Sequence, residues 1–377
     1  MLTVLNVAYP FAPVGPDAVG GAEQVVCMLD RALVAAGHRS VVIAEDGSEV
    51  GGELLPLPVT PAAAPITLAT QAAAHDAVRQ AIGAALRSRP IDLVHLHGLD
   101  FLAYLPPPGP PVLVTLHLRH EWYPREALLP MRPDTWLHCV STAQHWALLA
   151  HLGPRAAKIL PPIANGVPVE ALAASRHACR GYVLVLGRIC AEKGQHAAIE
   201  AARMAGVPLL IAGQVFPYPE HTAYFEAEIR PRLGPGCRFL GPVGFARKCR
   251  LLAAARCLLL PTLVPETSSL VAMEALACGT PVIAFAACAV ENIVEHGRTG
   301  FVVDDPAAMA AAIGRAGTID RDACRRVARE RFSATRSTEA YLALYRRLAA
   351  PPPNPPPQAG EGKGGGRQGH CGAALAG

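Results

Sequence analysis

Short apolar runs alternate with longer amphipathic segments along the chain, up to about residue 350. Apolar runs such as residues 2–8 and 182–187 are typical of strands that are buried on both faces of a parallel sheet. Longer segments such as residues 72–87 and 195–205 are typical of the helices that connect such strands. The pattern therefore predicts an α/β fold built on parallel sheets.

The alternation is interrupted at residues 161–168, where prolines and an Asn-Gly pair mark a domain boundary. The predicted strands are residues 2–8, 40–44, 92–97, 111–117, 135–141, 182–187, 208–213 and 238–241, a run from 258, a run ending at 284, and 300–303. The predicted helices are residues 21–36, 72–87, 195–205, 221–233, 247–255, 269–278, 306–315, 321–331 and 337–348. This order predicts two Rossmann-like, doubly wound parallel-sheet domains that face each other across a cleft.

The composition restricts the class of protein further. A chain of 377 residues is long enough for two domains with complete cores, and its net charge of +4 gives no support for a nucleic-acid partner. Its 11 cysteines include no Cys-x-x-Cys pair, which favours buried thiols and gives zinc binding little support. The tail, residues 351–377, is rich in proline and glycine, and we expect it to be disordered.

Nothing in the apolar pattern predicts a membrane-spanning segment. No uninterrupted apolar run approaches the roughly 20 residues that a bilayer requires, and residues 1–8 lack the charged start and the cleavage site of a signal peptide. We therefore expect a cytoplasmic protein, with peripheral contact at the inner face of the membrane left open. Residues 117–132 mix arginines with aromatic residues, which suits either such contact or a packed loop.

Polar or glycine residues follow several predicted strands of the first half. The Gly20-Gly21 turn follows the first strand, and His97, His117 and Ser141 end three later ones. The carboxyl ends of parallel strands meet at one edge of a sheet, so we expect these residues to border one crevice. The dinucleotide fingerprint Gly-x-Gly-x-x-Gly is missing from the Gly20-Gly21 turn, which argues against a nicotinamide-dependent oxidoreductase.

In the second half of the chain, cations and carboxylates lie in the segments that follow predicted strands. Arg188 and Lys193 follow a strand, and a guanidinium together with an ammonium suits a diphosphate group. Glu266 precedes a predicted helix, and Glu274 lies within it. A helix N-terminus attracts phosphate, while the flanking carboxylates accept hydrogen bonds from hydroxyl groups. Sugar, diphosphate and ribose in this order make up a nucleotide sugar.

The turn before that helix is the third part of the pattern. Thr267, Ser268 and Ser269 are residues that cap helices, and Gly279 suits the left-handed position after the helix.

Taken in order, these motifs resemble the family 4 retaining glycosyltransferases of GT-B fold. The resemblance extends over about residues 1–348. It is carried by the following segments: Gly20-Gly21-Ala22-Glu23, the strand ending at His117, Val140-Ser141, Asn165-Gly166-Val167, Gly187-Arg188, Lys193-Gly194, Glu266 with Glu274, and residues 291–300. Its most specific part is the Glu-x7-Glu spacing ahead of Ala-Cys-Gly-Thr-Pro-Val.

The resemblance implies a role for each matching residue. Glu266 contacts hydroxyls of the donor sugar, Glu274 contacts the ribose diol, and His117 lies beside the transferred sugar. Arg188 and Lys193 hold the diphosphate. The residues implied to bring backbone close to the donor are Gly20, Gly21, Thr267, Ser268 and Ser269. The chain departs from the family at residues 267–269, where Thr-Ser-Ser replaces a frequent Gly-Phe-Gly.

The implied reaction is transfer of a sugar from a nucleotide-diphosphate sugar to an acceptor hydroxyl, with retention, without a metal, and with no cofactor besides the donor. The acceptor stays open between a glycan, a lipid-linked sugar and a small molecule. Alternatives are a nucleotide-sugar epimerase, a phosphorylase of the same fold, and an inactive homologue that binds the donor. We expect domains at residues 1–165 and 166–332, with residues 333–350 as a helix that packs back toward the first domain.

Overall fold

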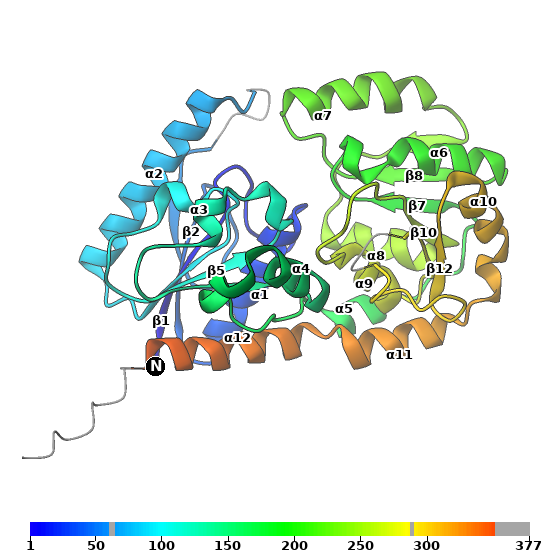
Figure 1. Ribbon diagram of the computed structural model, residues 1–377. Helices are drawn as coiled ribbons and strands as arrows, with labels where there is room; N and C mark the ends of the chain where they lie inside the picture. The colour runs from blue at the N-terminus through cyan, green and yellow to red at the C-terminus, as the bar shows by residue number, and fades with distance from the viewer. Residues whose placement is uncertain (60–64, 287–289, 351–377) are drawn as a thin grey trace, which may run out of the picture.

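The computed structural model describes residues 1–59, 65–286 and 290–350, so the predicted disorder of residues 351–377 lies outside the described residues. Within these ranges the chain forms two parallel sheets of six strands each, every sheet with its own helices (Figure 1). The two-domain α/β prediction is confirmed.

The first sheet has the strand order β3-β2-β1-β4-β5-β6. Its strands are β1 (Thr3–Val7), β2 (Arg39–Glu45), β3 (Glu53–Leu57), β4 (Leu93–Leu96), β5 (Val112–Leu116) and β6 (Thr135–Cys139). The principal helices around it are α1 (Gly21–Ala35), α2 (Leu68–Ser88), α3 (Arg125–Leu128) and α4 (Thr142–Leu152). The order reverses between β1 and β4, and such a switch point opens a crevice at the carboxyl ends of the strands.

The second sheet repeats this order as β12-β11-β10-β7-β8-β9. Its strands are β7 (Val183–Leu186), β8 (Leu209–Ala212), β9 (Cys237–Phe239), β10 (Cys257–Leu260), β11 (Val282–Phe285) and β12 (Gly300–Val303). Its helices are α5 (Val169–Ala173), α6 (Gln195–Met204), α7 (Pro219–Tyr224), α8 (Phe245–Ala254), α9 (Leu270–Ala277), α10 (Pro306–Arg315) and α11 (Arg321–Arg331). The second switch point therefore lies between β7 and β10.

The last described helix, α12 (Ala334–Ala349), leaves the second domain and lies along the first (Figure 1). The hydroxyl of Tyr345 is 2.7 Å from Nδ1 of His95 on β4, and both side chains are buried. The two segments that connect the domains also pair with each other. The Val167 amide donates to the Phe332 carbonyl at 2.8 Å, and the Ala334 amide donates to the Val167 carbonyl at 2.9 Å.

Most element predictions agree with the structure, and the exceptions have physical causes. The bounds of α10 and α11 coincide with the predicted helices. β3 is absent from the predicted strands because it is a sheet edge that contains Pro56, which disrupts a strand pattern. α4 is missing from the predicted helices because it exposes the large apolar side chain of Trp146, which makes its sequence pattern weakly amphipathic.

Candidate active site

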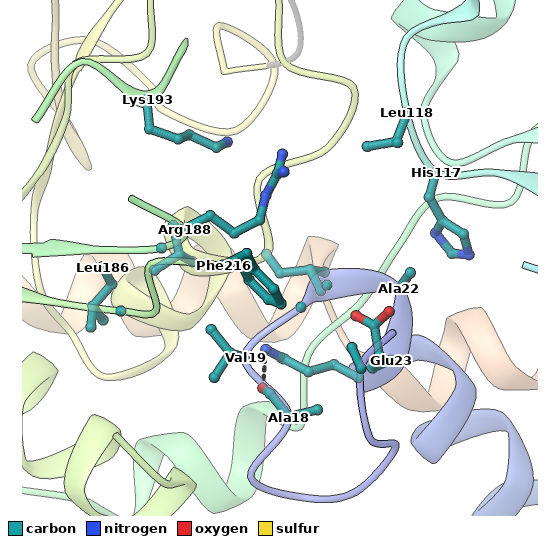
Figure 2. Close-up of a pocket in the computed structure, with 18 of the residues that line it drawn as sticks. Ala18, Val19, Ala22, Glu23, His117, Leu118, Leu186, Arg188, Lys193 and Phe216 are labelled. Carbon is teal, nitrogen blue, oxygen red and sulfur yellow. Dashed lines mark hydrogen bonds between the residues drawn. The ribbon is translucent and has the colours of Figure 1, made fainter. Parts of the chain in front are cut away.

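A cleft of about 540 Å³ lies between the carboxyl ends of the two sheets (Figure 2). It is bordered by the segments that follow β1 and β5 on one side and β7 and β10 on the other. All residues that the sequence analysis assigned to the donor site line it. They are Gly20, Gly21, His117, Arg188, Lys193, Glu266, Thr267, Ser268, Ser269 and Glu274.

The Gly20-Gly21 turn brings the N-terminus of α1 close to the second domain. A Cβ on Gly20 would lie 1.8 Å from Oε2 of Glu23, and a Cβ on Gly21 would lie 3.3 Å from Cδ1 of Leu270. Glu23 itself is buried, and this burial raises the pKa of its carboxyl group while nearby Arg188 acts in the opposite direction. The glycines thus allow the first turn of α1 to face the first turn of α9 across the cleft.

The loop after β7 carries the two predicted cations. The Arg188 carbonyl accepts a hydrogen bond of 2.7 Å from Nε2 of Gln195, which fixes the backbone. The Arg188 guanidinium makes no hydrogen bond or ion pair with the described residues, and it extends toward the N-terminal domain (Figure 2). Gly194 follows Lys193 with φ of +63°, and a Cβ there would lie 2.1 Å from the Pro261 carbonyl oxygen. Close contact between the β7 and β10 loops therefore requires a glycine.

Glu266 and Glu274 each form an ion pair with a lysine. Glu266 pairs with Lys193, and its Oε1 also accepts a hydrogen bond of 2.9 Å from Thr262. Glu274 is almost fully buried and pairs with Lys248 in the first turn of α8. Sequence reasoning missed Lys248. The only signal was its place early in a predicted helix, and folding alone brings it to Glu274.

The Thr267–Ser269 turn behaves differently from the expected cap. Ser269 occupies the N-cap position of α9, but its side chain makes no capping hydrogen bond. Thr267 instead donates from Oγ1 to the His117 carbonyl at 2.8 Å, across the cleft. Ser268 Oγ is buried without a hydrogen-bond partner among the described residues. The first backbone N–H groups of α9 thus stay open toward the cleft, where an anion can bind.

His117 is a neutral imidazole in this setting. Burial lowers its pKa to about 3, and His138 adds to the effect. Its Nε2 lies 3.0 Å from Nδ1 of His97, whose Nε2 is buried without a partner among the described residues. A buried unpaired N–H is costly, so the favoured arrangement has His97 donating from Nδ1. His117 then carries its proton on Nδ1.

Two other predictions have structural explanations. Ser141 accepts a hydrogen bond from the Gln144 amide at 3.2 Å and caps α4, and it does not line the cleft. In the 117–132 segment, the buried Arg132 guanidinium donates to the carbonyls of Pro106 and Pro110 at 2.9 and 2.8 Å. This contact anchors the end of the segment to the first domain, while Trp122 and Met131 of the same segment are exposed.

Helix length gives one further finding about the molecule. None of the helices in the described part of the chain is both long and apolar enough to cross a membrane.

Two doubly wound domains that meet at their switch points around a cleft define the GT-B class of α/β proteins. Comparison with known proteins agrees with this class. The sequence model described as Glycosyltransferase Family 4 matches residues 19–170, and the one described as Glycosyl transferases group 1 matches residues 180–317. The chain belongs to the family 4 glycosyltransferases.

Two relatives show how far the similarity extends. The D-inositol 3-phosphate glycosyltransferase of Nocardioides sp. is 35% identical over 152 residues, which are 37% of this chain and 32% of that protein. The chain thus matches about a third of the length of this relative. The phosphatidyl-myo-inositol mannosyltransferase of Mycolicibacterium smegmatis is 28% identical over 338 residues, covering 80% of this chain and 82% of that protein.

Solved structures share the fold. AviGT4, a glycosyltransferase involved in avilamycin A biosynthesis, superposes with a TM-score of 0.67 at 25% identity, over 93% of this chain and 98% of that one. Anabaena HepE in complex with UDP-glucose superposes with a TM-score of 0.67 at 19% identity, over 92% of this chain and 100% of that one.

Proposed function

We propose that this protein transfers a sugar from a nucleoside-diphosphate sugar to an acceptor hydroxyl, with retention at the anomeric carbon and without a metal. One observation carries the proposal. Both switch points open on one cleft, which holds Arg188, Lys193 and the open N-terminus of α9 together with two carboxylates, the partly buried Glu266 and the buried Glu274. We assign Glu266 to the sugar, Arg188 and Lys193 to the diphosphate, and Glu274 to the ribose of the donor.

The cations have a direct role in the chemistry. As the bond from the anomeric carbon to the diphosphate breaks, negative charge accumulates on the leaving oxygen. Arg188, Lys193 and the N-terminal dipole of α9 stabilise that charge, so the step does not require a metal. Lys193 is paired with Glu266 in the structure, and we expect donor binding to redistribute this pairing toward the phosphate.

The carboxylates recognise hydroxyl groups. Lys248 occupies Oε1 of Glu274, which leaves Oε2 to accept hydrogen bonds from the ribose diol. Glu266 accepts hydrogen bonds from hydroxyls of the donor sugar. Its Oε1 already receives hydrogen bonds from Thr262 and Lys193, which makes it a weak nucleophile. The neutral His117 donates from Nδ1 to the transferred sugar.

The transfer itself proceeds on one face of the sugar. The acceptor oxygen bonds to the anomeric carbon on the side from which the diphosphate leaves, through a transition state that resembles an oxocarbenium ion. The acceptor proton passes to the departing phosphate oxygen. Glu266 is the only carboxylate proposed to approach the reacting carbon, and its hydrogen bonds to Lys193 and Thr262 make it a weak nucleophile, so we expect no covalent sugar–protein intermediate.

A panel of nucleotide sugars tests the proposal. The full chain is incubated with each donor and with acceptors of the three classes, namely glycans, lipid-linked sugars and small polyols, and products are identified by mass spectrometry. We expect one donor to give slow hydrolysis without an acceptor and a glycosylated product with the right one. An isomerised donor with no transfer would indicate an epimerase instead. If no donor or nucleoside diphosphate raises the melting temperature, the proposal is wrong.

A further inference from the structure

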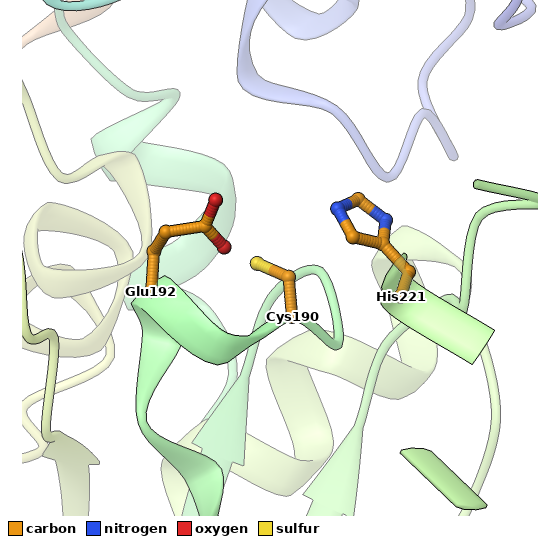
Figure 3. Close-up of side chains that lie close together, drawn as sticks. All are labelled: Cys190, Glu192 and His221. Atoms are coloured by element: carbon orange, nitrogen blue, oxygen red, sulfur yellow. The ribbon is translucent and has the colours of Figure 1, made fainter. Parts of the chain in front are cut away.

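Three side chains with different metal-ligating atoms meet at the edge of the cleft (Figure 3). Cys190 and Glu192 lie in the loop after β7, and His221 lies in the first turn of α7. One ligating atom from each residue lies within 4.8 Å of the other two. Cys190 is fully buried and His221 nearly so, while Glu192 is partly exposed.

The geometry is close to that of a metal site. Three atoms within 4.8 Å of one another all lie within about 2.8 Å of a common point, which is 4.8 Å divided by √3. Zinc bonds are about 2.3 Å to sulfur, about 2.0–2.1 Å to a histidine nitrogen and about 2.0–2.2 Å to a carboxylate oxygen. Side-chain movements of less than about 1 Å would therefore bring all three atoms to bonding distance.

The present contacts leave these groups incompletely satisfied. The Cys190 thiol interacts with the Glu192 carboxylate and lies 3.9 Å from the Arg188 carbonyl oxygen, which is a weak contact. His221 packs its ring edge against Tyr218, and its Nδ1 is buried without a hydrogen-bond partner among the described residues. Figure 3 shows the other ring nitrogen on the side of Cys190 and Glu192, so an imidazole, a thiol and a carboxylate face one another, which is the donor set of a metal site.

We propose that Cys190, Glu192 and His221 bind one thiophilic divalent cation of the Zn²⁺ type. Thiolate and carboxylate neutralise its charge, and imidazole completes three protein ligands of the kinds that zinc uses. Glu192 and His221 both line the cleft, so the fourth coordination position faces it. The proposed transfer chemistry does not need this ion, and the ion site does not depend on the proposed function.

The surroundings determine how tightly the ion binds. Burial raises the pKa of the Cys190 thiol to about 11, so the ion must displace a proton and binding strengthens as pH rises. Arg188 stabilises the thiolate but repels the ion, so binding is weaker than in a structural zinc site. His221 is distant in sequence from Cys190 and Glu192. The spacing between cysteines gave zinc binding little support in the sequence analysis, because a single cysteine contributes to this site.

Titration of the reduced, metal-free full chain with Co²⁺ tests the site, because a cobalt–thiolate bond produces a charge-transfer band in the near ultraviolet. We expect one equivalent of Co²⁺ to produce the band and Zn²⁺ to abolish it. Cys190→Ser should remove the band, and Glu192→Gln or His221→Gln should weaken Co²⁺ binding at least about tenfold. The matched controls are Cys237→Ser, a buried thiol in the same domain, and Cys179→Ser, an exposed one.

Two results would overturn the site. One is the absence of a thiolate band in the wild-type chain. The other is a band that survives in Cys190→Ser and disappears in Cys179→Ser, which would assign it to the exposed thiol. Each variant is first checked by circular dichroism. If Cys190→Ser does not fold, Glu192→Gln decides the matter, because glutamine has nearly the same size as glutamate and residue 192 is partly exposed.

Discussion

Glu274 and Glu266 belong to one short segment, yet they face different partners. Glu274 is paired with the buried Lys248, and Glu266 with the more exposed Lys193. We expect Glu274→Gln to raise the Kd for the free nucleoside diphosphate roughly tenfold to a hundredfold, because the ribose loses hydrogen bonds to a charged group. Isothermal titration calorimetry measures this change.

Glu266→Gln is the matched variant. It frees Lys193 for the phosphates, so the affinity for the same nucleoside diphosphate should stay unchanged or increase while sugar transfer falls. Equal losses of affinity in both variants would contradict the assigned roles. Glu274→Gln also breaks the buried ion pair with Lys248 and should lower stability. The melting temperature of each variant therefore shows whether a loss of affinity comes from partial unfolding.

Three buried histidines of the first domain, His95, His97 and His138, and the partly buried His117 make the stability of the fold depend on pH in the acid range. Burial lowers the pKa of His117 to about 3 and that of His138 to about 4, and it lowers those of His95 and His97 as well. An unfolded histidine titrates near about 6.5, so the unfolded chain binds more protons below that pH. The free energy of unfolding should therefore fall as pH drops from about 6.5 toward 4, by about 1.4 kcal/mol per pH unit for each histidine.

His138→Gln tests this dependence. Urea unfolding at several pH values should show a shallower slope of stability against pH than the wild type, by about one proton. The exposed His177 serves as the control, and His177→Gln should leave the slope unchanged. If both variants keep the wild-type slope, His138 is not among the groups that cause the acid sensitivity.

At the scale of elements, the sequence was informative where local pattern decides the structure. The strands that precede Gly20, His117 and Arg188 are short apolar runs, so their ends could be placed, and the cleft residues with them. Lys248 could not be placed, because its pairing with Glu274 depends on how α8 packs beside α9. The Thr267 hydrogen bond to His117 likewise depends on the distance between two domains.

The N-terminus of α8 is the clearest case of local structure that depends on contact between the two domains. Its N-cap is Gly244, which has no side chain, and Oδ1 of Asp17 in the first domain accepts from the Phe245 amide at 2.6 Å instead. A side-chain cap contributes about 0.5–2 kcal/mol, and here it also holds the cleft together. We expect Asp17→Ala to increase the radius of gyration of the ligand-free chain in small-angle scattering.

Asp17→Asn is the control for the cap, because asparagine retains an oxygen that can accept from the Phe245 amide. It should scatter like the wild type. A radius of gyration that changes equally in both variants would point to charge rather than capping, and no change in Asp17→Ala would show that the other contacts suffice.

In the whole molecule, the two domains touch on one side of the cleft, and two paired connecting segments join them elsewhere. Besides the Asp17 cap, the hydroxyls of Tyr9 and Tyr218 lie 2.5 Å apart, and the Ile66 amide donates to the Pro217 carbonyl at 3.2 Å. The connecting segments run side by side, with Val167 bridged to Ser333. This arrangement suits opening and closing around the connecting segments, with the donor bound in the closed state.

Gly166 lies at the point where the two connecting segments touch. A Cβ there would come within 2.6 Å of the Ser333 carbonyl oxygen and 2.8 Å of the Ala334 Cα, and backbone atoms cannot rotate away as a side chain does. We expect Gly166→Ala to separate the segments, to destabilise the chain by about 1–3 kcal/mol, and to lower sugar transfer at least tenfold.

Small-angle scattering measures the effect on closure. We expect a saturating donor to reduce the radius of gyration of the wild type, and Gly166→Ala should lose this contraction. Free nucleoside diphosphate should still bind, since its contacts lie mainly in the second domain. Gly234→Ala is the control, because nothing lies within 4 Å of its Cβ. A Gly166→Ala chain that contracts and turns over like Gly234→Ala would place the hinge elsewhere.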